Sequence, residues 1–487
     1  MPKHVTLTRE CLTVRKQRIS LYASALAIQA LLASPCVFAN PQVNTAPSIP
    51  PVGQPEAQPA ASAGSANPDT ETSRQLAEQF RSNADEWAPI NALAAPGLTS
   101  RFPPISDSIL GNKGGWRSEL AEKGFNIELR IKSGVTANLR DSTAPKNGYV
   151  GQDADLLYGG PSLTIVSDLD KLLGVPNAKM TFVAGSYYTT AEVQKGDNDT
   201  SINEISYYQS FLDDSMSVNF GYGPQWTRFV GLFTGGQLVL SDSLSSLIPL
   251  QVGLPASPFG SPFFNFQLGG ESGPYTKLGI SQSISTLGRT WEGDHNGIGF
   301  QFHKNNANAL YIGEIGDKNE SSPDQYYKWI RAGVIYNTSE YDKFDGGKNE
   351  NKAVYALADF QLTQPDNWLS YRGLYTNIGI QAAPSDVNVY TRSYTAKLYY
   401  KAPFLSRPLD ATSVSFKYNA FSKDASDYYR SLGVDTQSDQ TQVDVQYVAH
   451  VASGVYLTPQ LSWIHHPSFA NDYPDALLAS LNFLISF

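Results

Sequence analysis

The sequence predicts an all-β protein, a transmembrane antiparallel up-and-down β-barrel of about sixteen strands. One observation is the C-terminal segment 477–487, in which apolar residues alternate with a more polar set and the chain ends on Phe487. About ten alternating residues can cross a bilayer as one tilted strand. A second is an N-terminal stretch typical of exported proteins. The third is a mean hydropathy of -0.29, with no apolar run after residue 39 long enough for a transmembrane helix.

Residues 1–39 have the features of a secretory signal peptide. Five basic residues precede an apolar stretch at 19–32, and a cleavage site with small residues ends at Ala39. Cleavage there would leave a chain more acidic than the full sequence, whose net charge is -9. Both cysteines, Cys11 and Cys36, lie in the segment that we expect to be removed. The mature chain would therefore contain no disulfide and no thiolate metal site.

Residues 40–104 are predicted to form a periplasmic linker. Residues 40–69 are rich in proline and alanine and contain too few large apolar side chains to form a core. Within residues 72–87, Phe80 and Trp87 lie near helical spacing among charged residues, which predicts one short amphipathic helix. A helix resting on the periplasmic rim and a contact for oligomerisation or the cell wall both fit this pattern.

The barrel is predicted to occupy residues 105–487. In its first strand, which begins near Phe125, apolar residues alternate with charged and amide side chains. This pattern recurs without a second kind of layer, which favours a membrane barrel with a polar lumen over a soluble sheet. At roughly 23 residues per strand, the chain after Trp116 allows about sixteen strands, enough to leave an aqueous channel. The clearest later stretches are 358–362, 394–401, 414–420 and 443–451.

Two motifs resemble those of a known protein family. Residues 111–117 read GNKGGWR before a predicted short helix, and residues 457–467 read LTPQLSWIHHP before the closing strand. They resemble the carbohydrate-selective porin family, the OprB family, whose first motif reads Gly-Asp-Trp-Gly-Gly-x-Arg. Lys113 replaces its tryptophan, and the likeness is weak between the two ends. Over about residues 105–487 the resemblance implies a sixteen-stranded porin that passes sugars across the outer membrane.

Five side chains are the candidate substrate-binding residues. Three belong to the inward face of the first strand, and two belong to the central region. A neutral sugar calls for paired hydrogen-bond donors and acceptors and for an aromatic face against its C–H surface. General lining of the lumen is the alternative role for each of them. The candidates are Glu128, Arg130, Lys132, Trp226 and Arg228.

Two other functions stay open from the sequence. An anion-selective or general porin is the first, although anion selectivity needs an inward cluster of basic residues and those here are interspersed with acids. A secreted soluble β-rich glycan-binding protein is the second, because it would share much of the composition. The histidines show no HExxH spacing, and no Gly-x-Ser-x-Gly motif occurs. We therefore expect no enzyme activity, no metal and no cofactor.

The expected location is the outer membrane of a Gram-negative bacterium. The expected partners are small neutral sugars or polyols, outer-membrane lipid, and the barrel assembly machinery, which would engage the closing strand ending in Phe487. No nucleic acid is expected. The sequence does not choose between a monomer and a homo-oligomer.

Overall fold

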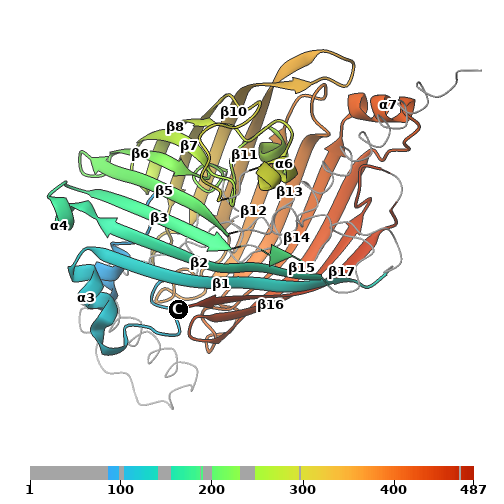
Figure 1. The fold of residues 1–487 in the computed structure, drawn as a ribbon. Helices are drawn as coiled ribbons and strands as arrows, with labels where there is room; N and C mark the ends of the chain where they lie inside the picture. The colour runs from blue at the N-terminus through green and yellow to red at the C-terminus, as the bar shows by residue number, and fades with distance from the viewer. Residues whose placement is uncertain are drawn as a thin grey trace, which may run out of the picture.

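A computed structural model describes residues 86–97, 104–140, 155–186, 188–189, 200–230, 247–295, 298–470 and 473–487. Its main feature is one antiparallel sheet whose strands pair in chain order (Figure 1). The first strand pairs with both the second and the last, so the sheet closes into a barrel. The predicted fold class is therefore confirmed. The predicted signal peptide and most of the predicted helix at 72–87 lie outside the described residues.

Seventeen labelled segments make up this sheet. β3 and the two-residue β4 both pair with β2, so β4 continues β3 and the barrel has the predicted sixteen strands. The segments are β1 (Phe125–Asn138), β2 (Asp155–Asp168), β3 (Ala178–Ser186), β4 (Tyr188–Thr189), β5 (Thr200–Phe211), β6 (Met216–Gly223), β7 (Ser261–Leu268), β8 (Gly273–Gln282), β9 (Ala309–Asn319), β10 (Lys328–Asp342), β11 (Lys348–Gln361), β12 (Gly373–Ala382), β13 (Tyr390–Lys401), β14 (Ala411–Phe421), β15 (Asp439–Ala452), β16 (Val455–His465) and β17 (Ala476–Ser486).

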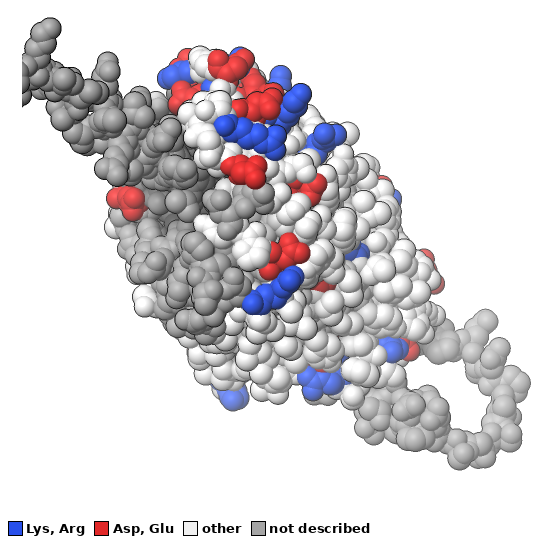
Figure 2. Space-filling view, turned by 90° about the vertical axis from the view of Figure 1, so that its right-hand side faces the viewer, with Lys and Arg blue, Asp and Glu red and all other residues white. Residues whose placement is uncertain are grey.

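The strands follow the predicted alternation between an apolar outer face and a polar inner face. In β1, Leu129 and Val135 are exposed on the outside, whereas Glu128 and Arg130 are buried inside. In β17, Leu481 is exposed and its neighbour Asn482 is buried. This arrangement is the reverse of that in a soluble protein, and it suits a wall with lipid outside and polar groups inside. Figure 2 shows charged side chains gathered mainly toward one end of the barrel, beside a broad stretch of wall with few of them.

Several helices mark the two ends of the barrel. The short helices η1 (Lys113–Gly115), α3 (Trp116–Glu122) and α4 (Leu169–Leu173) lie at the same end as the C-terminus, and α7 (Lys423–Ser431) lies at the opposite end (Figure 1). We call these the α3 end and the α7 end. Connections of a few residues, such as 269–272, occur at the α3 end, whereas the longest ones belong to the α7 end. No helix among the described residues is long and apolar enough to cross a membrane.

Arg117 joins the two ends of the chain at the seam of the barrel. Its Nε donates to the Gly111 carbonyl at 3.1 Å, and its Nη1 donates to the Ile127 carbonyl at 3.0 Å. Its Nη2 donates to the Phe487 carbonyl oxygen at 2.6 Å. One buried guanidinium thus connects the segment before the barrel, the first strand and the last residue.

Candidate functional site: the lumen and its constriction loop

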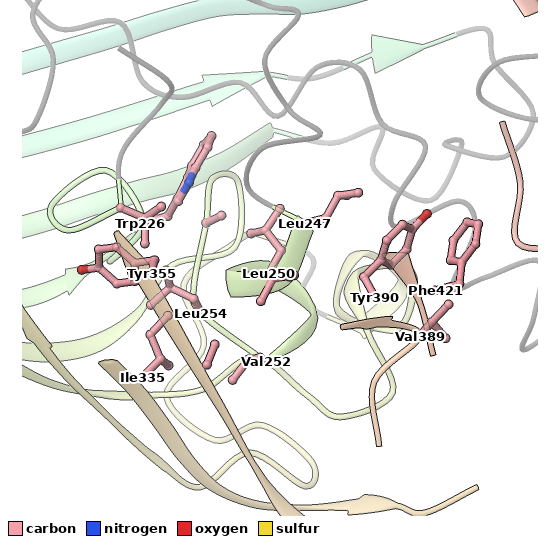
Figure 3. Packing of buried hydrophobic residues seen from close by; sticks show 14 of the residues in the cluster. Trp226, Leu247, Leu250, Val252, Leu254, Ile335, Tyr355, Val389, Tyr390 and Phe421 are labelled. Carbon is pink, nitrogen blue, oxygen red and sulfur yellow. The ribbon is translucent and has the colours of Figure 1, made fainter. Parts of the chain in front are cut away.

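The described parts of the connection between β6 and β7 pack inside the barrel. These parts, residues 224–230 and 247–260, include the helix α5 (Leu247–Gln251), and we call them the constriction loop. Loop side chains form one apolar cluster with lumen-facing side chains of β9, β10 and β11 (Figure 3). Burying both apolar surfaces together stabilises the inward fold by about 25 cal/mol per Å². The cluster includes Trp226, Phe229, Leu250, Val252 and Leu254 from the loop, and Leu310, Ile312, Ile335, Ala353 and Tyr355 from the wall.

Cationic side chains of the wall hold the backbone of this loop. Lys277 Nζ on β8 donates to the Arg228 carbonyl at 2.8 Å. Arg331 on β10 donates to the carbonyls of Phe229 at 3.2 Å and Val230 at 2.7 Å. These three consecutive carbonyls lie outside any strand ladder, so they need such donors when they are buried. The position of the loop is thereby fixed against β8 and β10.

Arg228, one of the predicted residues, forms a buried ion pair at the start of the constriction loop. Its Nη2 lies 2.5 Å from Glu204 Oε1 on β5, and both side chains are almost fully buried. Its Nη1 donates to the Pro224 carbonyl at 2.6 Å, and its guanidinium lies 4.4 Å from the centroid of the Phe263 ring. Trp226 is fully buried in the apolar cluster, so its indole ring presents no exposed face.

The three predicted residues of β1 lie on its inner face, as expected. Arg130 Nη2 lies 2.6 Å from Glu128 Oε2, and Asn126 Nδ2 donates to Glu128 Oε1 at 2.9 Å. Lys132 follows on the same face of the strand and is half-buried. Three of the five predicted residues thus belong to two separate ion pairs, Glu128–Arg130 within β1 and Glu204–Arg228 between β5 and the constriction loop.

Sequence reasoning missed a third charged cluster, on the inner face of β14, β15 and β16. Asp444 accepts hydrogen bonds from Ser415 Oγ at 3.0 Å and from Ser462 Oγ at 2.6 Å. Gln442 Nε2 also donates to it at 2.5 Å, and Lys417 Nζ lies 3.2 Å away. Lys417 and Asp444 are both at polar positions in strands where polar and apolar residues alternate. This alternation was the sequence signal that could have identified them.

The connection between β8 and β9 supports the constriction loop from the α7 end. It contains α6 (Arg289–His295), whose Glu292 lies 3.4 Å from Lys304 Nζ with both side chains fully buried. Lys304 also donates to the Gly260 carbonyl at 2.8 Å and to Ser261 Oγ at 3.1 Å. Burial lowers the pKa of Lys304, and the neighbouring Glu292 carboxylate counteracts this shift in part.

The family of this sixteen-stranded barrel follows from its similarity to known proteins. The model of the family described as "Carbohydrate-selective porin, OprB family" matches residues 162–487. The chain belongs to this family. It is therefore an outer-membrane porin, and the resemblance noted in the sequence is confirmed. The family and the fold both indicate a transport channel.

Individual relatives of this OprB-family porin are distant but match over most of their length. Porin B of Pseudomonas aeruginosa is 22% identical over 448 residues, which are 80% of this chain and 95% of that protein. The putative porin QuiX of Acinetobacter baylyi is 22% identical over 437 residues, 78% of this chain and 93% of that protein. The solved structure of Pseudomonas putida OprB shares the fold, with a TM-score of 0.68, 17% identity and coverage of 78% of this chain and 98% of that one.

Proposed function

We propose that this OprB-family porin lets small neutral sugars or polyols diffuse passively past the constriction loop. The supporting observation is that three cations of the lumen each lie beside an acid. The cation and the acid are 2.6 Å apart in the first pair, 2.5 Å in the second and 3.2 Å in the third. Close pairing of opposite charges leaves little net field in the lumen, which suits neutral solutes better than free anions. The pairs are Glu128–Arg130, Glu204–Arg228 and Lys417–Asp444.

The mechanism is exchange of hydrogen bonds along the wall. A sugar gives up part of its hydration at the constriction, and amide and hydroxyl groups of the lumen replace it. Gln442, Gln460 and Ser462 provide such neutral groups beside Asp444. Each contact must be weak enough for the solute to leave again, so several modest sites serve transport better than one tight site. No covalent step is involved.

Several further assignments belong to the same proposal. The signal peptide would be cleaved after Ala39. The short connections at the α3 end are typical of the periplasmic side of such barrels, so residues 40–104, which precede the barrel at this end, would be on the periplasmic side. The closing strand β17 would then present its terminal Phe487 to the assembly machinery. The apolar outer face of the strands would contact outer-membrane lipid.

Planar-bilayer conductance of the refolded mature chain tests the proposal. We expect reproducible pores whose ion current falls as glucose is added, because a sugar in the constriction displaces conducting ions. Titration with phosphate is the matched comparison, since an anion-selective porin would respond to phosphate in place of glucose. Pores that are blocked by phosphate and ignore glucose would overturn the proposed selectivity. No pores from a verified folded barrel would overturn the channel itself.

A further inference from the structure

The described part of the N-terminal segment, residues 86–97, contacts three strands of the barrel at the α3 end. Asn126 Nδ2 on β1 donates to the Leu93 carbonyl at 3.3 Å. Lys179 Nζ on β3 donates to the Ala92 carbonyl at 2.6 Å. At Gly97, a Cβ atom would lie 3.2 Å from Asn219 Nδ2 on β6, so the backbone passes close to this side chain.

These contacts are on the lumen side of the wall. Met180 and Phe220 are each 42% exposed and belong to the outer, apolar face of β3 and β6. Since successive side chains of a strand point to opposite faces, Lys179 and Asn219 point into the lumen. Asn126 shares the inner face of β1 with Glu128, with which it forms a hydrogen bond. The segment therefore lies across the inner rim of the mouth.

The segment is held by its own packing as well as by these hydrogen bonds. Residues 86–91 are helical, and Asn112 Nδ2 donates to Glu86 Oε1 at 2.6 Å. An apolar cluster joins the segment to Ile105 and to Ala121 of α3. The buried members that the segment supplies to this cluster are Trp87, Ile90, Leu93 and Ala94.

A cavity of about 400 Å³ lies between this segment and the constriction loop. Pro96 and Gly97 of the segment line it, and so does Arg228 of the constriction loop. The remaining lining belongs to strands and turns from β3 to β8 and is largely polar, with Lys179 and Lys277 among it. Its volume is in the range of small-molecule sites. Because Asn177, Asp214 and Gly270, from connections of the α3 end, also line it, the cavity is on that side of the constriction.

We infer that residues 86–97 form the floor of an exit chamber in the permeation path. A sugar that has passed the constriction loop next meets Pro96 and Gly97, and it leaves the barrel beside this segment. The segment thus contributes to the choice of solute by size, as a second narrowing after the constriction loop. This inference rests on the proposed passage of solute through the lumen, but it concerns a part of the chain outside the barrel strands.

Chemical modification of a single cysteine tests this inference. The mature chain is expected to contain no cysteine, so Pro96→Cys would provide its only thiol. Reaction with methanethiosulfonate ethylsulfonate in a planar bilayer should cause an irreversible stepwise drop in single-channel current of roughly twofold, because the bulky anionic group occupies a cavity of small-molecule size. Asp170→Cys is the matched control, since Asp170 is exposed on α4 at the same end and does not line the cavity. It should react without a current step.

Complete modification of Pro96→Cys without a change in current would overturn the inference that residues 86–97 line an exit chamber. A glucose titration of the unmodified variant keeps the two proposals apart. If the current ignores glucose but falls on modification, the sugar proposal fails and the chamber stands.

If Pro96→Cys does not fold, Lys179→Met provides an independent test. This variant removes the hydrogen bond to the Ala92 carbonyl, so we expect a larger and noisier current as the segment moves away from the mouth. Lys123→Met is its control, because Lys123 is exposed at the same end and lines no part of the cavity. A current identical to that of the unmodified chain in Lys179→Met would contradict the inference.

Discussion

One buried ion pair of the lumen joins residues from different parts of the chain. Glu204 on β5 pairs with Arg228 at the start of the constriction loop, and both are almost fully buried. Taking a charge out of water is costly, and a close opposite charge offsets much of that cost. The arrangement makes each partner dependent on the other.

Replacing one member of this pair should therefore destabilise the barrel more than replacing both. We expect Glu204→Gln to lower the free energy of unfolding by about 3–5 kcal/mol, because the Arg228 guanidinium is left buried beside a neutral group. The double variant Glu204→Leu with Arg228→Met should recover much of this loss. Urea unfolding in detergent micelles, followed by the mobility shift of the folded barrel on gels, measures both. Losses that simply add in the double variant would show that the two side chains do not depend on each other.

At the residue scale, sequence reasoning found both members of one ion pair but only Arg228 of the other. The alternation in β1 placed Glu128 and Arg130 on the same face, two residues apart, and the structure pairs them. Glu204 and Arg228 are separated by a strand, a turn and another strand. Only the barrel register and the inward turn of the loop bring them together.

At the scale of elements, the strand faces are set by the alternation of side chains. In β17, Leu481 is 45% exposed on the outer face and Ser480 lies on the inner face. Its register against β1 pairs Leu481 with Val135, another exposed apolar residue. A one-residue slip would turn every such side chain toward the lumen.

Charge substitutions on the two faces of β17 should therefore differ. We expect Leu481→Arg to make folding into lipid vesicles less favourable by about 2–4 kcal/mol, the cost of a basic side chain near the middle of the bilayer. Ser480→Arg, one position away and facing the lumen, is the matched control and should cost clearly less. Urea titrations of both variants in vesicles of the same lipid compare them. Equal losses would contradict the assignment of faces.

The sequence did not predict the constriction loop, although it shows apolar residues on the part of the inner wall against which the loop packs. Leu310 and Ile312 on β9 and Ile335 on β10 are apolar residues at inward positions, in a barrel whose inner face carries many polar residues. Such positions indicate that something covers the inner wall. They do not indicate which segment covers it, because any apolar loop of sufficient length could do so.

At the scale of the whole molecule, closure of the barrel brings the two ends of the chain together. β1 pairs with β17 along nine residues of register, and Arg117 bonds to Gly111, Ile127 and Phe487 beside this seam. Asp107 adds a second connection, since it accepts a hydrogen bond from the Gly454 amide at 3.0 Å. The segment before the barrel is thus part of the closed structure.

Loss of the Arg117 side chain should weaken this closure. We expect Arg117→Met to lower the free energy of unfolding by roughly 1.5–3 kcal/mol or more, because hydrogen bonds from a charged donor are worth about that much each. Glu119→Gln on the same helix is the control, as this side chain makes none of the three contacts at the seam. The urea midpoint of both variants in micelles is the measurement. An unchanged midpoint in Arg117→Met would mean that strand pairing alone holds the seam.

The sequence by itself determined the membrane barrel, its approximate number of strands and the inner-face position of Glu128, Arg130 and Lys132, because alternation with a period of two is a local property of the chain. The tertiary structure decided the rest: which charges pair, that the constriction loop packs inward, and that residues 86–97 cross the mouth. These features depend on contacts between residues far apart in sequence. They exist only once the sheet has closed and has brought inward-facing side chains of many strands around one shared space.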